Sequence, residues 1–223
     1  MSSGVQGGFE FSEAGCGSAP IELRDASLWY FPLVFTADEA DALLNYCLSC
    51  LPWRQDFLVI AGKRVAIPRL QNWFGDPDAH YSYSGLALTP LPWTAQLLRI
   101  RDRAESIAGQ SFNAALANYY RNGRDSVGWH SDDEKELGPQ PVIASVSLGA
   151  TRVFEMRHRY DKTIKTLRLP LTHGSVLVMK GGTQQFWRHQ LPKAEEVTRP
   201  RVNLTFRKIL VYLKHNVMRL ISC

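Results

Sequence analysis

The sequence predicts an α+β fold in which helices pack on one face of an antiparallel double sheet. Two helical patterns lie in the first half of the 223-residue chain, and a series of short β-rich segments begins at Ser111. The number of these segments fits a jelly roll, also called a double-stranded β-helix. Hydrophobic residues make up 45% of the sequence and charged residues 21%, so a packed core is expected.

Two helices are predicted ahead of the strands. Thr36-Ala-Asp-Glu39 has the spacing of a capping box and opens a helix that ends near Pro52. A second helical pattern follows Pro92, and Gly109 is a suitable C-terminal stop for it. Because these helices precede a run of strands, we expect them to cover one face of the sheet.

The first predicted helix contains a C-x-x-C pair, Cys47 and Cys50. Both cysteines fall within the apolar stripe of this helix, and no second pair completes a zinc site. We therefore expect them to be buried thiols.

Short strands account for most of the remaining chain. Phe57-Leu-Val-Ile60 and Val65-Ala-Ile67 are apolar runs around a Gly-containing turn, which predicts a hairpin over residues 57–67. Further strands are predicted over residues 112–120, 142–148, 151–157, 164–169, 175–180 and 202–210.

A single domain is expected over residues 23–213, with mobile tails over residues 1–22 and 214–223. The first twenty residues are rich in Gly, Ser and Ala and lack the pattern of a signal peptide. No apolar stretch approaches the roughly 20 residues that a membrane span requires. The four cysteines lack the spacing of a secreted disulfide scaffold. We therefore expect a monomeric intracellular protein with no membrane partner, cytoplasmic in a bacterium or nuclear in a eukaryote.

The charge balance is basic, with a formal net charge of +5. A positive balance favours polyanionic partners such as nucleic acids. Many basic proteins bind no nucleic acid, however, so this feature has meaning only beside a suitable site.

A His-x-Asp motif, His130-Ser-Asp132, is the first candidate for chemistry. Residues two apart on a strand point the same way, so the imidazole and the carboxylate could reach one metal ion. Two histidines and one carboxylate bind iron(II) and leave positions open for a cosubstrate and dioxygen. A second histidine is needed, and spacing alone does not choose between His173 and His189.

The segment Arg201-Val-Asn-Leu-Thr-Phe-Arg207 alternates polar and apolar residues. This period of two places the polar side chains on one face of a strand. Two arginines inside a sheet need an anion, and a dicarboxylate fits a guanidinium fork. An edge strand with its polar face in water explains the same pattern, and the pattern itself does not decide between the two.

These motifs together resemble the AlkB family, especially its DNA-repair members. The resemblance covers about residues 30 to 210. It rests on the His130-x-Asp132 motif, on His189 in Trp-Arg-His-Gln-Leu-Pro and on the Arg201–Arg207 strand. Supporting matches are Pro68-Arg69, Tyr81-Ser-Tyr-Ser-Gly85, Asn118-Tyr-Tyr120, Ile143-Ala-Ser-Val-Ser-Leu-Gly149 and His173-Gly-Ser.

The resemblance implies a role for each of these residues. His130, Asp132 and His189 would hold iron(II), and His173 would be a structural residue. Arg201 would pair with the far carboxylate of 2-oxoglutarate. The remaining residues of the cosubstrate pocket would be Asn118, Tyr120, Asn203, Thr205 and Arg207.

The resemblance also implies oxidative demethylation of DNA bases such as 1-methyladenine and 3-methylcytosine. Dioxygen and 2-oxoglutarate are consumed, and formaldehyde, succinate and CO2 are released. By this resemblance the methylated base would be flipped out of the helix and held between Tyr83 and His130, with Tyr81 and Glu134 at its edge. Without the resemblance, Tyr81 and Tyr83 would be interpreted as a surface pair in a loop.

The predicted hairpin would belong to a nucleotide-recognition lid of about residues 54–90. In duplex-acting members of the family an apolar wedge on this hairpin fills the gap left by the flipped base. Ile60 or Ala61 would be that wedge here, with Lys63, Arg64 and Arg69 as cations for the phosphates. An ordinary solvated hairpin is the alternative interpretation.

Two other functions remain open from the sequence. The same metal centre could act on RNA or on a protein side chain, and release of formaldehyde from each substrate would separate these enzymes. A catalytically silent reader of methylated bases is a further alternative, although all three metal ligands and both arginines are present.

Overall fold

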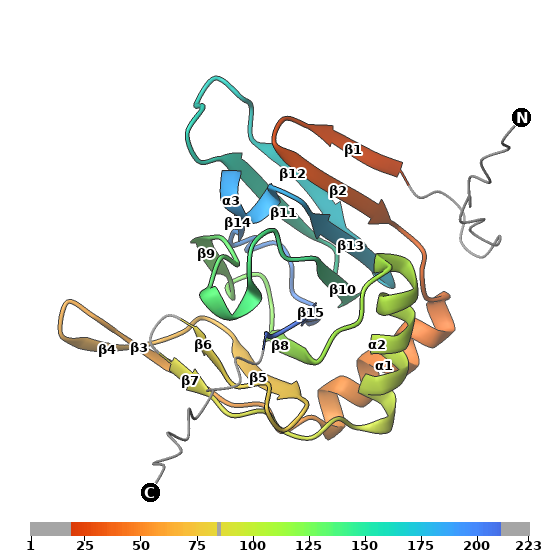
Figure 1. The fold of residues 1–223 in the computed structure, drawn as a ribbon. Helices are drawn as coiled ribbons and strands as arrows, with labels where there is room; N and C mark the ends of the chain where they lie inside the picture. The colour runs from red at the N-terminus through yellow and green to blue at the C-terminus, as the bar shows by residue number, and fades with distance from the viewer. Residues whose placement is uncertain (1–18, 84–85, 211–223) are drawn as a thin grey trace, which may run out of the picture.

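Two facing antiparallel sheets form the body of the protein (Figure 1). The computed structural model describes residues 19–83 and 86–210, with the backbone alone at positions 19, 60, 81–83 and 86–88. The larger sheet has the strand order β1-β2-β13-β10-β15-β8-β5, and the smaller sheet has the order β12-β11-β14-β9. These two sheets confirm the expected α+β jelly roll.

The larger sheet consists of β1 (Ala19–Leu23), β2 (Ala26–Phe31), β5 (Leu70–Gly75), β8 (Ala114–Tyr120), β10 (Ile143–Gly149), β13 (Ser175–Lys180) and β15 (Arg201–Arg207). The smaller sheet consists of β9 (Val127–His130), β11 (Arg152–His158), β12 (Leu167–Leu171) and β14 (Trp187–Leu191).

Two helices, α1 (Ala37–Cys50) and α2 (Ala95–Ala108), cover the outer face of the larger sheet. Thr36 and Glu39 form the predicted capping box at the start of α1. Gly109 ends α2 in the left-handed conformation that glycine adopts without strain. Apolar residues of both helices pack against alternate residues of β8, β10, β13 and β15, so one face of each strand is committed to this core.

A second core lies between the two sheets at one end of the molecule. Leu28, Ile143 and Leu177 of the larger sheet pack there against Met156 and Trp187 of the smaller one. The other end of the same intersheet space is lined largely by polar residues. The apolar core therefore fixes the distance between the sheets beside a polar cavity.

A hairpin of β3 (Phe57–Ile60) and β4 (Lys63–Ala66) forms where the sequence predicts it. Ala61 and Gly62 both have positive φ, 48° and 77°, as a tight two-residue turn with the twist of a hairpin requires. A second small hairpin follows, with β6 (Tyr81–Tyr83) and β7 (Leu86–Leu88). Both lie beside β5 at the end of the molecule where the larger sheet finishes (Figure 1).

The structure corrects several expectations from the sequence. The segment Ala19–Leu23 is a strand paired with β2, so the tail predicted over residues 1–22 is too long. Cys47 is buried as expected, but Cys50 is exposed because it stands in the last turn of α1. The short helices η1 (Lys135–Leu137) and α3 (Thr183–Phe186) had no clear periodic signal, since each spans about one turn.

Both expected tails lie mainly beyond the described part of the chain, which ends at residue 210 and begins at residue 19. Within that part, no helix has the length and apolar character needed to cross a membrane.

Candidate active site

The cavity between the sheets is lined by strands that are central rather than peripheral. β15 lies between β10 and β8, and all seven of its residues are buried. Its alternate residues Val202, Leu204 and Phe206 belong to the core under the helices. Arg201, Asn203, Thr205 and Arg207 therefore face the cavity. The interpretation of this segment as an edge strand in water is wrong.

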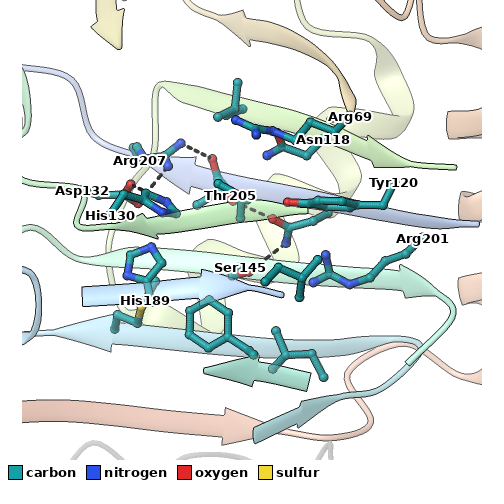
Figure 2. A pocket seen from close by; sticks show the side chains of 17 residues that line it. Arg69, Asn118, Tyr120, His130, Asp132, Ser145, His189, Arg201, Thr205 and Arg207 are labelled. Carbon is teal, nitrogen blue, oxygen red and sulfur yellow. Dashed lines mark hydrogen bonds and ion pairs between the residues drawn. The ribbon is translucent and has the colours of Figure 1, made fainter. Parts of the chain in front are cut away.

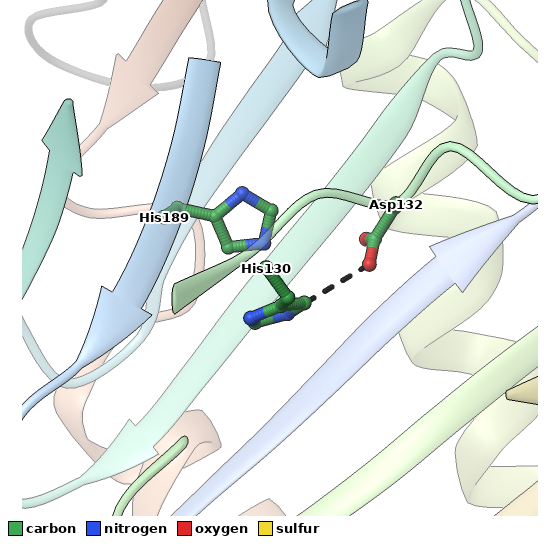
Figure 3. Close-up of side chains that lie close together, drawn as sticks. All are labelled: His130, Asp132 and His189. Atoms are coloured by element: carbon green, nitrogen blue, oxygen red, sulfur yellow. Dashed lines mark ion pairs between the residues drawn. The ribbon is translucent and has the colours of Figure 1, made fainter. Parts of the chain in front are cut away.

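Three possible metal ligands converge at one end of the cavity (Figure 3). His130 ends β9, His189 is its direct partner on β14, and Asp132 follows two residues after His130. One ligand atom from each residue lies within 4.8 Å of the other two. The cross-strand pairing thus brings together residues 59 positions apart in the sequence.

The neighbours of His130 and Asp132 orient both side chains. Nδ1 of His130 lies 2.8 Å from the carbonyl oxygen of Gly128, which only accepts, so Nδ1 carries the proton and Nε2 presents its lone pair. Arg207 donates from Nη2 to Oδ2 of Asp132 at 2.8 Å. The side-chain oxygen of Gln184 accepts from the backbone N–H of Asp132.

Charge and burial set these three groups in the protonation states that bind a metal. Burial lowers the pKa of His189 to about 3 and also lowers that of His130, so both imidazoles are neutral near pH 7. Burial alone would raise the pKa of Asp132, but the charge of the nearby Arg207 guanidinium, with a smaller effect of the two imidazoles, outweighs it and lowers the pKa to about 2. The cluster is therefore one carboxylate and two neutral imidazoles.

Two orphaned atoms indicate that this donor set fits a metal ion. Oδ1 of Asp132 and Nδ1 of His189 are buried and have no hydrogen-bond partner among the described residues. Unsatisfied buried polar atoms are costly, and a cation would satisfy the carboxylate oxygen. Two imidazoles and a carboxylate are the ligand set of non-haem iron(II) oxygenases. His173 instead accepts a hydrogen bond from the Gly149 backbone and lies near Asp41, outside this cluster.

The opposite end of the cavity is built around Arg201 and Tyr120 (Figure 2). These two residues are direct partners on β15 and β8, and Asn203 pairs in the same way with Asn118. The guanidinium of Arg201 lies over the Tyr120 ring, 5.3 Å from its centroid. A polar wall therefore runs from Arg201 to the three-residue cluster.

Hydrogen bonds fix the side chains of this polar wall. Arg201 donates to Ser147 Oγ at 2.9 Å, and Asn203 donates to Ser145 Oγ at 2.8 Å. Thr205 Oγ1 donates to the side-chain oxygen of Asn203 at 3.0 Å. The wall is rigid, so its shape is present before any ligand binds.

Arg201 is a buried cation without a carboxylate in the described structure. Its side chain is 3% exposed, no ion pair is formed, and Nε has no hydrogen-bond partner among the described residues. Burial is the main reason that the pKa of Arg201 falls to about 10, which still leaves the group charged at pH 7. An uncompensated buried guanidinium is an anion-binding site.

The predicted base-contact residues are described only in part. The side chains of Tyr81, Tyr83 and Ile60 lie outside the described residues. Ala61 is exposed at the hairpin turn, and Glu134 is half-buried immediately before η1. The side chain of His130 is 23% exposed, so this ligand forms part of the cavity entrance.

Arg69 differs from the sequence-based expectation. It was expected to meet phosphates together with Lys63 and Arg64, but it is 5% exposed and lines the inner cavity. Its Nε donates to the side-chain oxygen of Asn118 at 2.7 Å. Arg69 therefore orients Asn118 from inside the cavity.

Other residues of the site were not found from the sequence. Ser145 and Ser147 hold the polar wall, and their alternation along β10 is the signal that could have identified them. Phe154 packs on His189 with ring centroids 5.2 Å apart, and Arg152 is buried behind Tyr120. Neither residue lies in a motif that spacing could reveal.

The fold and the site define a class: a jelly-roll protein with a two-histidine, one-carboxylate cluster beside an anion site. The model of the 2OG-Fe(II) oxygenase superfamily matches residues 27–207. A solved structure of OsALKBH1 has a TM-score of 0.60 at 17% identity, covering 85% of this chain and 100% of that one. This likeness supports the fold alone.

Several named proteins are similar in sequence. DNA oxidative demethylase ALKBH2 of Mus musculus is 48% identical over 157 residues, 68% of this chain and 66% of the relative. ALKBH2 of Bos taurus is 44% identical over 201 residues, 84% of this chain and 71% of the relative. Alpha-ketoglutarate-dependent dioxygenase alkB homolog 3 of Homo sapiens is 41% identical over 187 residues, 80% of this chain and 65% of the relative.

The chain therefore belongs to the 2OG-Fe(II) oxygenase superfamily and, within it, to the AlkB family. Its matches to the mouse and human proteins span slightly less than two thirds of their lengths.

Proposed function

We propose that this protein is an iron(II)- and 2-oxoglutarate-dependent dioxygenase that demethylates N-methylated bases in DNA. One observation carries the proposal: a metal-ligand cluster and an uncompensated buried arginine occupy the two ends of one cavity. A 2-oxo dicarboxylate has a metal-chelating end and a free carboxylate, which match these two ends. The relatives named DNA oxidative demethylase support the substrate.

His130, Asp132 and His189 would hold the iron, and Arg201 would bind the far carboxylate of 2-oxoglutarate. When bound, iron and 2-oxoglutarate would allow dioxygen to hydroxylate the N-methyl carbon, with release of succinate and CO2. The hydroxymethyl product then loses formaldehyde and leaves the repaired base. Arg207 would keep Asp132 ionised, because its positive charge stabilises the carboxylate. Its hydrogen bond to Oδ2 would also hold the side chain so that Oδ1 is left for the metal.

The polar wall of the cavity would position the cosubstrate. Asn118, Tyr120, Asn203 and Thr205 line this wall with Arg207. Hydrogen bonds from Arg69 to Asn118, from Asn203 to Ser145 and from Thr205 to Asn203 leave these side chains little freedom for reorientation. A preorganised wall loses little conformational entropy when the ligand binds.

The methylated base would enter beside His130, with Tyr81, Tyr83 and Glu134 as its remaining contacts. Methylation at N1 of adenine or N3 of cytosine makes the base cationic, and a carboxylate and aromatic rings favour a cation. The same methylation removes base pairing, so flipping this nucleotide costs less. Residues 54–90 would form the lid over the flipped nucleotide.

All the groups proposed for the reaction come from one chain, so the protein would act as a monomer. It would act where the cell keeps its DNA, in the cytoplasm of a bacterium or the nucleus of a eukaryote.

The test combines the protein, iron(II), 2-oxoglutarate and an oligonucleotide with one 1-methyladenine, mixed without oxygen and then exposed to air. We expect loss of one methyl group by mass analysis and an equivalent amount of formaldehyde. Matched oligonucleotides of DNA and RNA and a methylated peptide identify the preferred substrate. Formaldehyde from RNA or peptide alone would refute the DNA assignment, and no product from any of them would refute the enzyme.

A further inference from the structure

Arg152, the first residue of β11, is buried outside the cavity and has an unusual set of partners. It is 2% exposed. Its guanidinium donates to three backbone carbonyl oxygens, those of Asn122 at 3.3 Å, Asp125 at 3.0 Å and Pro192. No carboxylate oxygen in the described structure lies within ion-pair distance of it. Its hydrogen bonds therefore go to peptide carbonyls, while the carboxylates of Glu196 and Asp125 lie farther away and favour its charge from a distance.

These carbonyls belong to the two connections that lead between the ends of the active site. Residues 121–126 connect the cosubstrate strand β8 to β9, which carries His130. Residues 192–200 connect β14, which carries His189, to β15, which begins with Arg201. Arg152 therefore contacts both connections at once.

The two connections also pack closely against each other. The N–H of Gly123 donates to the carbonyl of Val197, and the N–H of Ala194 donates to the carbonyl of Gly123. A Cβ at Gly123 would stand 1.6 Å from the carbonyl oxygen of Ala194, so only glycine allows this approach. The guanidinium of Arg152 holds the same junction from the side of the smaller sheet.

Arg152 is also a second cation near the cosubstrate end. Its guanidinium lies 6.0 Å from the centroid of the Tyr120 ring, and that of Arg201 lies 5.3 Å from the same centroid. The nearby carboxylate of Asp125 is occupied by Arg121, whose Nε and Nη2 both donate to it at 2.8 Å. Two buried cations thus share one tyrosine ring, and the charge of Arg152 contributes to the lowered pKa of Arg201.

We propose that Arg152 is a positioning residue that gives the cavity its selectivity for a dicarboxylate. It holds the two connections in place and adds positive potential behind Tyr120, where the far carboxylate meets Arg201. It does not touch the cosubstrate, because it is absent from the cavity lining. The inference rests on the proposed use of 2-oxoglutarate and adds a residue to it.

The physical basis is that two charges interact over a longer distance in a water-poor protein interior than in solvent. The guanidinium groups of Arg152 and Arg201 repel each other when no anion is bound. A carboxylate bound in the cavity against Arg201 would relieve that repulsion. A 2-oxo acid without the second carboxylate gains nothing from Arg152. The charge should therefore alter the affinity for 2-oxoglutarate and leave the affinity for 2-oxobutyrate nearly unchanged.

The experiment measures binding rather than turnover. The protein is loaded with Mn(II) in place of iron, and the dissociation constants of 2-oxoglutarate and 2-oxobutyrate are measured by calorimetry. The variants are Arg152→Gln, which removes the charge, and Arg152→Lys, which keeps it without the fork to three carbonyls. Arg168→Gln is the matched control, since Arg168 is an exposed arginine on the neighbouring strand β12.

For Arg152→Gln we expect 2-oxoglutarate to bind about tenfold more weakly, with 2-oxobutyrate within about twofold of the wild type. Arg152→Lys should lower the preference for 2-oxoglutarate over 2-oxobutyrate about threefold. This variant tests the inference if Arg152→Gln does not fold. The control should keep the wild-type ratio. Mn(II) affinity without cosubstrate should stay the same in every variant.

A wild-type ratio in both Arg152 variants overturns the inference, and so does an equal loss for both acids, which would indicate a purely structural role. These outcomes leave the proposed function intact, because the wild type still prefers 2-oxoglutarate. A wild-type protein that does not prefer 2-oxoglutarate overturns both.

Discussion

The polar wall of the cavity and the β3–β4 hairpin are built in opposite ways. On the wall, β15 is buried along its whole length, and its polar side chains bond to neighbours on the adjacent strand. On the hairpin, the described side chains of β4 are all exposed, and Val59 is 76% exposed. One hairpin contact, the Arg64 guanidinium over the Phe57 ring at 3.9 Å, lies within the hairpin itself.

This difference separates the chemistry from the choice of substrate. Strand pairing fixes the wall, so a change there should affect every substrate alike. The hairpin is attached through its base, where Asp56 accepts from Gln71 and pairs with Arg54. Its exposed apolar side chains have no packing role in the described structure, and exposed apolar groups of this kind mark interaction sites. A substitution in the hairpin should therefore change the relative activity on single and double strands and leave the reaction at the metal site unaffected.

The largest effect is expected from the metal cluster. His130→Ala removes one of three ligands, and we expect iron binding and demethylation to fall by more than about a hundredfold on single and double strands alike. The protein should stay folded, because His130 contributes little to either core. Metal content and formaldehyde release are the measurements. Activity near that of the wild type would show that the metal lies elsewhere.

Asp132→Ala should cost stability as well as activity, which distinguishes it from His130→Ala. Arg207 and Asp132 are 4% and 2% exposed, so removal of the carboxylate leaves a buried guanidinium without its partner. We expect a loss of about 3 kcal/mol in the free energy of unfolding of the metal-free protein. The double variant Asp132→Ala with Arg207→Met should recover most of this stability. Equal stability of the single and double variants would show that the ion pair is not the cause.

Arg201→Lys should have the next largest effect, and on the cosubstrate alone. An ammonium group cannot reproduce the bidentate fork. We expect the 2-oxoglutarate concentration needed for half-maximal rate to rise about tenfold or more, with single and double strands affected equally. Titration of 2-oxoglutarate on both substrates is the measurement. An unchanged requirement would assign the anchoring of the far carboxylate to another residue.

The sequence predicted the wall better than its surroundings, for physical reasons. The alternation of Arg201–Arg207 specifies a strand with two faces, and Thr36 and Gly109 specify helix ends through local chemistry. Within the described residues, the hydrogen bonds of Arg152 go to backbone carbonyls, which no side-chain pattern encodes. The burial of Arg69 could not be predicted, because an arginine beside a hairpin has the same sequence signature whether its guanidinium points outward or inward. Strands β9 and β14 are short and carry polar residues, so their pairing depends on the tertiary fold.

The smallest effect, and the sharpest test of the comparison, is expected from the hairpin. Ile60→Ser with Ala61→Ser removes the proposed wedge at the turn, and Val59→Ser removes the exposed valine beside it. Insertion of an apolar side chain into a base stack offsets part of an unstacking cost of about a few kcal/mol, and single strands have no such cost. We therefore expect each variant to lose about tenfold on methylated duplexes and less than about twofold on single strands. The ratio of the two rates is the measurement, because it cancels any change in active enzyme. Glu22→Gln on the distant strand β1 is the control and should leave the ratio unchanged. Equal losses on both substrates would exclude the wedge, and the hairpin would then be an ordinary solvated turn whose substitution tells nothing about how the base is reached.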